Sequence, residues 1–340
     1  MKIISLVNQK GGCGKTTTAV NLSYALASKN YKVLLIDLDP QAHATFSLGI
    51  NPTLTIADLF ENIINNRSFD LNGFLILRKD NLFVLGSSIG LSAMEEVLAH
   101  RQDKLEILLK LFSQLKMNFD YCLIDCPPNL GILTLNALLV SSQSIVPMGI
   151  CEYSLKGVEN LSNILGILAN FRGKLPSIFY LITQLDKRYK FSEVFLKRVK
   201  ENLGNQLLST MIRTNIHLRE AASFGKSIFE YKKDSRGSED YKKLAEEIEN
   251  ITKNASWVQF IFKAQDINEV YIAGEFNDWR KDQGYKLKRL NLNTWFINLP
   301  LKKGKYRYKL LADGKWLKDP TNNLEEDDTF GGKNSILLVG

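Results

Sequence analysis

The sequence has few cysteines and no apolar run long enough for a membrane-spanning helix. Its 4 cysteines in 340 residues are too few and too scattered for a disulfide framework, which favours a reducing cytoplasm. Cys122 and Cys126 are close in sequence, but we expect no zinc site because no histidine or further cysteine lies near them. The opening MKIISLVNQ enters a strand pattern directly, so we expect neither a signal peptide nor a transit peptide.

The composition is ordinary for a globular protein. With 45% hydrophobic and 24% charged residues, a chain of 340 residues has room for two domains or one large one. The formal net charge of +8 permits an anionic partner but does not require one, because a modest surplus of lysine is often only a solvated surface.

Apolar strand patterns alternate with helical patterns over about the first 250 residues. Near-continuous Val, Ile and Leu runs are typical of parallel strands buried on both faces. They occur in IISLVN, KVLLIDLD, YCLIDCPP, SIVPMGI and IFYLITQ. Helical patterns such as KTTTAVNLSYALASKN and DKLEILLKLFSQLKMN lie between them, and SEDYKKLAEEIENITKN predicts a last helix with Ser238 as its N-cap. The alternation predicts an α/β fold with a doubly wound, mostly parallel sheet.

After Asn254 the pattern changes to short strands rich in aromatic and β-branched residues. They are WVQFIFKA, EVYIAGEF, TWFINLPL, KYRYKLLA and SILLVG. The Asn-Asp, Lys-Gly and Asp-Gly pairs between them are typical of tight turns. We therefore expect two domains, 1–253 and 256–340, of which the second is a small all-β, immunoglobulin-like sandwich.

The segment NQKGGCGKTTT follows a strand and opens a helix, which is the context of a phosphate-binding loop. Its glycines allow backbone N–H groups to converge on phosphate oxygens at the positive end of the helix. Lys15 is placed to reach the β- and γ-phosphates, and the Thr16 hydroxyl is placed to bind Mg²⁺. Gln9 stands where the general pattern has its first glycine, so this P-loop is a variant that opens with KGG.

Carboxylates end two of the expected strands. Asp37 and Asp39 close KVLLIDLDPQ, and Asp125 closes YCLIDCPP. The carboxyl ends of neighbouring parallel strands face the ligand crevice. There one carboxylate can hold Mg²⁺ through water, and another can orient the water that attacks the γ-phosphate. The loop and these acids together predict an ATPase that uses Mg²⁺.

KGGCGKTTT, DLDPQ and FDYCLIDCPPNLG resemble the ParA-type partition ATPases, the Soj branch of the deviant Walker A superfamily. The likeness extends over about the first 250 residues. It implies a homodimer with ATP sandwiched between the subunits, which binds DNA without sequence preference on the nucleoid. It also implies a ParB-like stimulating partner, and a chromosome, plasmid or other cargo to be positioned.

The same resemblance implies roles for single residues. Lys10 contacts the phosphates of the partner subunit, Asp39 positions the hydrolytic water, and Asp125 holds Mg²⁺ through water. Asp37 is a further candidate metal ligand. The implied catalytic residues are Lys10, Lys15 and Asp39. The implied nucleotide contacts are Lys10, Gly11, Gly12, Cys13, Gly14, Lys15, Thr16, Thr17 and Asn215.

DNA binding in this family uses a basic surface, since phosphate contacts from Lys and Arg need no base reading. Arg188 matches one DNA-contacting arginine of the family, and a second aligns with His217, which is largely neutral near pH 7. Arg213 and Arg219 flank His217 and are further candidates. The wider basic set is Lys187, Lys190, Lys197, Arg198 and Lys200. The alternative is a solvated helix face. We expect no operator binding, because no helix-turn-helix extension is present, and no membrane docking, because no basic amphipathic tail is present.

EVYIAGEFNDWRKD, KGKYRYKLLADGKWLKDP and FGGKNSILLV resemble the glycogen-binding module of the AMP-activated kinase β subunit. The resemblance implies an α-glucan or glycogen site, because a flat aromatic ring suits the C–H face of a sugar. The implied contacts are Trp279, Lys309, Trp316, Phe330 and Asn334. Alternation within strands places Trp257, Trp295, Tyr306 and Tyr308 in the core instead. The alternative is a protein-docking or dimerising surface.

Two functions of different kinds fit these features. One is an ATP-switched positioning ATPase with an added glucan receptor. The other is a glucan- or protein-binding regulator whose ATPase half only senses nucleotide. We do not expect an iron–sulfur reductase of the same superfamily, because Cys13 and Cys126 do not match its cross-dimer cysteines.

Overall fold

The computed structural model describes residues 1–151, 153–172, 175–186, 188–254, 256–282, 285–291, 293–329 and 331–339. Lys187 and Phe330, two of the predicted contact residues, lie outside these described ranges. Contacts divide the chain into two units, Met1–Val158 with Ile178–Ile248, and Glu159–Ser177 with Glu249–Gly340. Within the described ranges, no helix has both the length and the apolar character needed to cross a bilayer.

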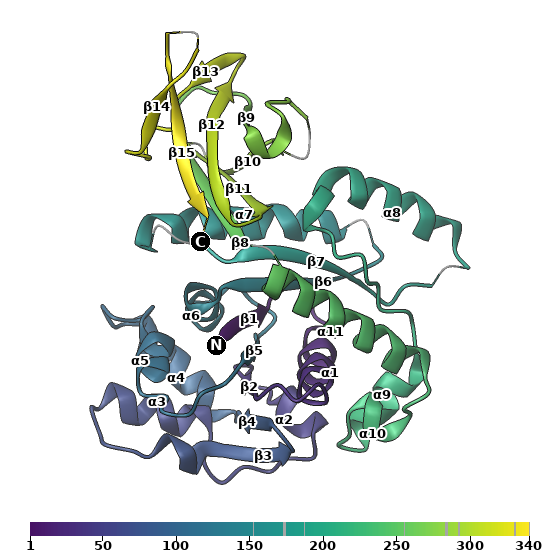
Figure 1. Ribbon diagram of the computed structural model, residues 1–340. Helices are drawn as coiled ribbons and strands as arrows, with labels where there is room; N and C mark the ends of the chain where they lie inside the picture. The colour runs from purple at the N-terminus through teal and green to yellow at the C-terminus, as the bar shows by residue number, and fades with distance from the viewer. Residues whose placement is uncertain are drawn as a thin grey trace. The chain divides into compact units, whose positions relative to one another are not determined.

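One seven-stranded sheet, in the order β3-β4-β2-β5-β1-β6-β7, organises the described part of the first unit (Figure 1). Its strands are β1 (Lys2–Leu6), β2 (Val33–Asp37), β3 (Leu75–Lys79), β4 (Leu82–Leu85), β5 (Tyr121–Asp125), β6 (Gln143–Gly149) and β7 (Ser177–Thr183). The pairs β4–β2, β2–β5, β5–β1 and β1–β6 are parallel, and β3 runs antiparallel to β4 at one edge. The predicted mostly parallel α/β sheet is therefore confirmed.

Helices cover both faces of this sheet (Figure 1). The longer ones are α1 (Lys15–Ala27), α3 (Ile56–Ile64), α4 (Gly90–Ala99), α6 (Ile132–Val140), α8 (Lys190–Leu203) and the first part of α11 (Arg236–Asn254). The helix α7 (Tyr153–Arg172) belongs mostly to the second unit. The shorter ones are α2 (His43–Ser47), α5 (Ile107–Ser113), α9 (Ile216–Ser223) and α10 (Ile228–Tyr231). Because both faces are covered, β2, β5, β6 and β7 are buried along their whole length.

Two helices differ from their predicted bounds. The helix α5 covers only Ile107–Ser113 of DKLEILLKLFSQLKMN. Asp103 lies before this helix and forms ion pairs with Arg101 and with Lys110 of α5. The helix α11 begins at Arg236, before the predicted cap Ser238. The Oγ atom of Ser235 accepts a hydrogen bond from the backbone N–H of Ser238 at 3.2 Å, so Ser235 provides the capping group.

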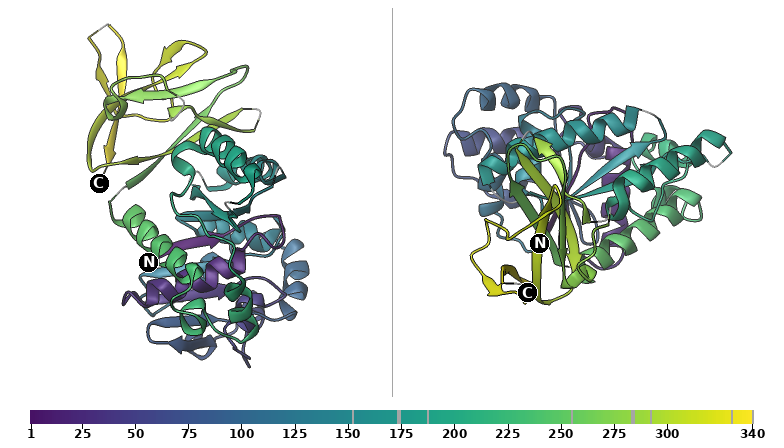
Figure 2. Two further views of the ribbon diagram at one scale, coloured as in Figure 1. Left: turned by 90° about the vertical axis from the view of Figure 1, so that its right-hand side faces the viewer. Right: turned by 90° about the horizontal axis from the view of Figure 1, so that it is seen from above.

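The second unit contains two antiparallel sheets, shown from two further sides in Figure 2. One has the order β10-β11-β8, and the other has the path β13-β12-β15-β14, with β9 also paired to β12. The strands are β8 (Ser256–Lys263), β9 (Val270–Gly274), β10 (Lys288–Asn291), β11 (Thr294–Leu301), β12 (Gly304–Ala312), β13 (Lys315–Leu317), β14 (Glu325–Asp327) and β15 (Lys333–Val339). This confirms an all-β C-terminal part.

Aromatic and aliphatic side chains from both sheets form the core of the second unit. Trp295 and Tyr308 are buried in it, as predicted, and Tyr306 packs against it. Trp257, also predicted in the core, is only half-buried. The segment that precedes β7 belongs to the same unit, because the Gln259 amide bonds both the N–H and the carbonyl of Leu175, at 3.0 and 3.1 Å.

Candidate functional site

The phosphate loop connects β1 to α1 and depends on glycine for its shape. Gly12 and Gly14 have φ values of 70° and 92°, in the left-handed region that side chains rarely adopt. Within the described ranges, no atom outside the adjacent residues lies within 4 Å of where a Cβ on Gly11 or Gly12 would stand, so the space beside the loop is open. Lys15 is buried, and its Nζ donates to the carbonyl of Lys10 at 3.4 Å. Its ammonium group therefore lies across the loop, where the phosphates of a nucleotide would bind.

The other predicted contacts begin the helix that follows. Thr16 and Thr17 are half-buried in the first turn of α1. Cys13 is buried in the loop, and burial raises the pKa of its thiol despite the nearby charge of Lys15. This thiol is therefore protonated at neutral pH and serves as a packing group.

Asp125 has the burial and the unpaired oxygens expected of a cation-binding carboxylate. It is fully buried, and neither of its oxygens has a hydrogen-bond partner within the described ranges. Burial and the neighbouring charge of Asp37 raise its pKa well above the ordinary value. An unpaired buried carboxylate is costly unless a counter-ion neutralises it. Together with the Thr16 hydroxyl in the first turn of α1, Asp125 fits a Mg²⁺ site made of oxygen ligands and water.

Asp37 lies beside Asp125 in the β2–β5 register but is already hydrogen-bonded. Its Oδ2 accepts from the N–H and the hydroxyl of Thr45, at 2.8 and 2.7 Å, and its Oδ1 accepts from the N–H of Asp39 at 3.2 Å. Burial raises the pKa of Asp37 to about 6, although the Thr45 bonds oppose the rise. These contacts suit a residue that shapes the loop after β2 better than a direct metal ligand.

Asp39 lies past the end of β2 and is largely buried. Its Oδ1 accepts a hydrogen bond from the N–H of Gln41 at 2.9 Å. Within the described ranges no hydrogen bond to its Oδ2 is formed, and this residue has no ion pair. One oxygen is thus available to a water molecule.

Lys10 is exposed on the loop, unlike Lys15. Its Nζ donates to Sγ of Cys151 at 3.0 Å, and its N–H donates to the side chain of Asn8 at 2.9 Å. Partial burial raises the pKa of Cys151, but hydrogen bonds from Lys10 and Ser154 outweigh this, and the pKa lies below its usual value. The two lysines of the loop therefore occupy different environments, as two different roles require.

Asn215 is the N-cap of α9, and its Oδ1 accepts from the N–H of His217 at 2.9 Å. Its side-chain nitrogen lies 3.2 Å from where a Cβ of Gly237 would stand. Sequence reasoning missed two further contacts of the phosphate loop, from Thr183 and Gln184. Their only sequence signal is their position at the carboxyl end of a parallel strand, where ligand sites form.

The candidate DNA-contacting arginines mostly have acidic partners. Arg188 pairs with Asp186 at 2.6 Å, and Arg213 pairs with both Asp240 and Glu239 at 2.6 Å. Within the described ranges Arg219 has no ion pair. The ring of His217 contacts Glu220 at 2.8 Å.

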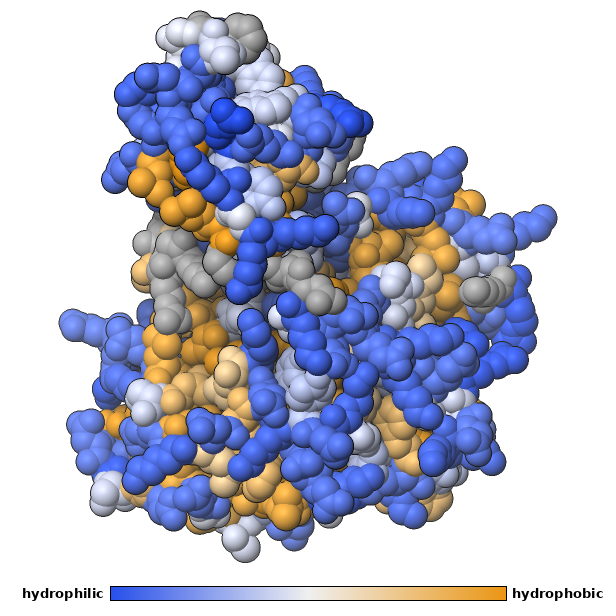
Figure 3. Space-filling view, in the orientation of Figure 1, coloured by the Kyte–Doolittle hydropathy of each residue, from blue (hydrophilic) through white to orange (hydrophobic). Residues whose placement is uncertain are grey.

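The surface beside Arg188 is not uniformly basic. Apolar residues gather over α8 on the face seen in Figure 3. At the start of α8, Tyr189, Phe191 and Val194 are exposed. Arg188 keeps most of its side chain in solvent, 85%, and can leave its pair for a phosphate. Arg213 is held by two carboxylates of α11, so it is better placed to fix α11 to the segment that precedes α9.

Trp279 and Trp316 lie together on the second unit. Their ring centroids are 6.4 Å apart, with an interplanar angle of 61°. Both line a hollow of about 850 Å³, to which Lys309 and Asn334 also contribute. Lys309 forms an ion pair with Asp328, and Asn334 is buried. Four of the five residues predicted for sugar binding therefore meet in one hollow.

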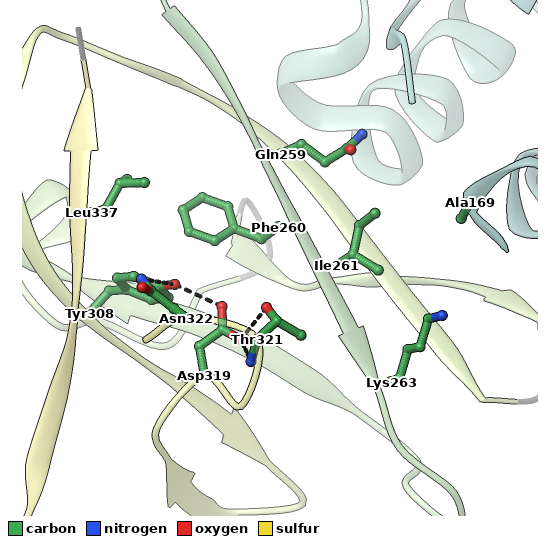
Figure 4. Close-up of a pocket in the computed structure, with 10 residues that line it drawn as sticks. All are labelled: Ala169, Gln259, Phe260, Ile261, Lys263, Tyr308, Asp319, Thr321, Asn322 and Leu337. Carbon is green, nitrogen blue, oxygen red and sulfur yellow. Dashed lines mark hydrogen bonds between the residues drawn. The ribbon is translucent and has the colours of Figure 1, made fainter. Parts of the chain in front are cut away.

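A smaller hollow in the same unit, of about 380 Å³, has a different character (Figure 4). Its polar groups bind one another: Tyr308 donates to Asp319 at 2.7 Å, Asn322 donates to Tyr308 at 3.1 Å, and Thr321 donates to Asp319 at 2.7 Å (Figure 4). Because these groups are already satisfied, this hollow offers a ligand less than the tryptophan hollow does.

Comparison with known proteins gives matches for both ends of the chain. Residues 1–175 match the family described as an AAA domain. Residues 258–340 match the glycogen recognition site of AMP-activated protein kinase. The first match contains the phosphate loop and all three acids, and the second contains all the predicted sugar contacts.

Individual relatives resemble the N-terminal part. Over 251 residues the chain is 37% identical to the sporulation initiation inhibitor protein Soj of Bacillus subtilis, covering 73% of this chain and 98% of Soj. It is 34% identical to the chromosome partitioning protein ParA of Myxococcus xanthus, covering 73% and 87%. Cobyrinic acid a,c-diamide synthase of Mycobacterium smegmatis, solved with an ATP analogue and magnesium, aligns with a TM-score of 0.63 at 27% identity, covering 74% and 96%.

Proposed function

Because the chain belongs to the ParA/Soj family of P-loop ATPases, we propose that it is an ATP-switched positioning protein that dimerises around ATP and moves a cargo over DNA. The cargo is a chromosome, a plasmid or another cell component on the nucleoid, and a ParB-like protein stimulates hydrolysis. The observation that carries this proposal is the open phosphate loop beside Asp125, whose buried oxygens have no hydrogen-bond partner within the described ranges.

The residues of the site divide the work of phosphoryl transfer. Backbone N–H groups of the loop and Lys15 bind the phosphates, and Thr16 and Asp125 hold Mg²⁺. A Mg²⁺ ion held by these residues would supply positive charge that neutralises the phosphates. Asp39 accepts a hydrogen bond from the attacking water through its available oxygen and so aligns that water with the γ-phosphorus. Lys10 leaves Cys151 and stabilises the phosphate charge in the partner subunit.

The C-terminal unit adds a receptor for α-glucan. The support is the hollow shared by Trp279, Trp316, Lys309 and Asn334, in which two aromatic faces stand beside a cationic donor and an amide. Sugars combine an apolar C–H face with hydroxyl edges, and this hollow matches both. The receptor ties the ATP switch to a polysaccharide.

A second candidate function has its own support. Arg188 and Arg213 are paired with carboxylates, and apolar side chains are exposed at the start of α8. These features favour a regulator that binds glucan or protein and uses its ATPase half as a nucleotide sensor, without moving on DNA.

Filter binding of the full chain to double-stranded DNA, with and without ATP, separates the two functions. We expect binding that needs ATP, shows no sequence preference and weakens steeply with salt as counter-ions are released. Arg188→Ala should weaken binding alike for every DNA sequence. Arg280→Ala is the matched control, because Arg280 also pairs with an aspartate two residues before it, at 2.7 Å. No binding with ATP, or equal binding by the nucleotide-free protein, supports the sensor instead.

A further inference from the structure

Two side chains at the end of β7 bind backbone carbonyls of the phosphate loop. The Thr183 hydroxyl donates to the carbonyl of Cys13 at 2.7 Å, and Nε2 of Gln184 donates to the carbonyl of Gly12 at 2.7 Å. Thr183 is buried, and its methyl group lies 3.6 Å from where a Cβ of Gly14 would stand. One strand end thus braces three successive loop residues.

These bonds fix the direction of the loop's donors. In a trans peptide unit the C=O and the following N–H point in opposite directions within one rigid plane. Holding the Gly12 carbonyl therefore aims the N–H of Cys13, and holding the Cys13 carbonyl aims the N–H of Gly14. N–H groups of such a loop are the groups that bind phosphate oxygens. Both carbonyls are held on one side, which leaves the two N–H groups directed to the other.

The backbone of Gln184 is itself unusual. Its φ is 54°, in the left-handed region that side chains other than Asn, Asp and Gly rarely adopt. Such conformations persist where the surrounding structure holds them, and they cluster at functional sites. The other end of the same amide, Oε1, lies 3.5 Å from where a Cβ of Gly149 would stand, at the end of β6. The amide of Gln184 is therefore packed between β6 and the loop.

We propose that Thr183 and Gln184 are positioning residues of the ATPase, which aim the Cys13 and Gly14 N–H groups at the phosphates of the nucleotide. Neither touches the nucleotide. They act through the loop, so their loss lowers affinity for phosphates and leaves the fold of the unit intact. The inference rests on the phosphate loop being the nucleotide site, as in the proposed function.

The test uses full-length variants that keep size but lose the donor, Gln184→Met and Thr183→Val. We expect the Kd for ADP and for ATP to rise about tenfold in each variant. Each variant leaves one loop N–H wrongly directed, and a hydrogen bond from such an N–H to a charged phosphate contributes that much. We also expect faster amide hydrogen exchange at Cys13 and Gly14 in the nucleotide-free variants, with a fall in the thermal midpoint no larger than the loss of one buried hydrogen bond produces. Gln114→Met, at an exposed position at the end of α5, should change neither quantity.

If Gln184→Met does not fold, Gln184→Asn replaces it. Asparagine suits the left-handed backbone but is too short to reach the Gly12 carbonyl, so it should fold and still bind ADP weakly. The inference would be overturned if the Gln184 variant that folds and Thr183→Val both kept the parent's nucleotide affinity and the parent's amide exchange. That result would leave the proposed function standing. A parent protein that binds neither ADP nor ATP would overturn the proposed function together with the inference.

Discussion

The three acids of the crevice differ in what their oxygens already bind, and this difference separates their roles. Both oxygens of Asp37 accept hydrogen bonds from the chain, one oxygen of Asp39 does, and neither oxygen of Asp125 does within the described ranges. A carboxylate whose oxygens are satisfied shapes the backbone. A buried one with none satisfied calls for a cation.

Asp39→Ala tests the water-positioning role. The variant should bind ATP about as well as the parent, because Asp39 is not part of the phosphate loop. Its turnover should fall by about 10²-fold or more, since loss of a group that aligns the attacking water has effects of that order. Steady-state phosphate release and ATP affinity measure the two quantities. Turnover equal to the parent's shows that another residue places the water.

Lys288 gives a prediction for the pH dependence of stability. Burial lowers its pKa to about 8 from the ordinary 10.5. Between these values the unfolded chain binds more protons than the folded one, so the free energy of unfolding should rise with pH. After allowance for the partial exposure of Lys288, the rise is on the order of 1 kcal/mol. Urea unfolding from pH 7.5 to 10 should show this rise in the difference between the parent and Lys288→Met, because the buried thiols, whose raised pKa values act in the opposite direction, are common to both proteins.

Site residues divide into those that a motif fixes and those that only the fold brings together. The spacing of Lys10, Lys15 and Thr16 encodes the loop locally, so the sequence alone predicts it. Thr183 reaches Cys13 only because β7 ends beside the loop, and no local pattern records a contact across 170 residues. The pairing of Arg213 with α11 was hidden for the same reason.

At the scale of elements, long buried strands were predicted and short strands were missed. The strands β2, β5 and β7 are fully buried, which requires continuous aliphatic runs that stand out in the sequence. The strands β3 and β4 are short and joined by a tight turn with Asn81 at a φ of 64°, so they carry little periodic signal. The short strands β10, β13 and β14 were missed for this reason too.

The two tryptophans come from different segments of the second unit, and both line the same hollow. Trp279 has a φ of 60° after η3 (Glu275–Asn277), and Trp316 lies in β13, with about half its surface exposed. Asn334 comes from β15, on the other side of β12 from β13. The site is thus assembled by the sheet, and its residues are spread over the unit.

Trp279→Ala and Trp316→Ala in the full chain test the glucan site. Each should lower retention on immobilised glycogen by about tenfold, because an aromatic face supplies most of the contact with a sugar. Asn334→Ala should lower retention less, since it removes one hydrogen-bonding group and leaves both aromatic faces in place. Tyr189→Ala removes an exposed aromatic residue of the first unit and is the control. Parent protein that passes through unretained would show that the hollow docks a protein or nothing.

At the scale of the whole molecule, the chain joins an ATPase of the ParA/Soj family to a module like the glycogen recognition site of AMP-activated protein kinase. Sequence motifs predicted both parts, because each carries its own signature. Two elements, α7 and α11, begin in the first unit and end in the second. The chain's net charge of +8 permits an anionic partner.

The central claim is that ATP drives dimerisation through Lys10, and light scattering of the full chain tests it most directly. With ATP and Mg²⁺, Asp39→Ala should double its mass from 38.6 kDa, because it binds ATP without consuming it. Adding Lys10→Ala to that variant should keep ATP affinity, since Lys15 serves the subunit's own nucleotide, but should leave the mass at 38.6 kDa. An unchanged mass in Asp39→Ala, or an ATP dimer that forms equally well without Lys10, would contradict the account.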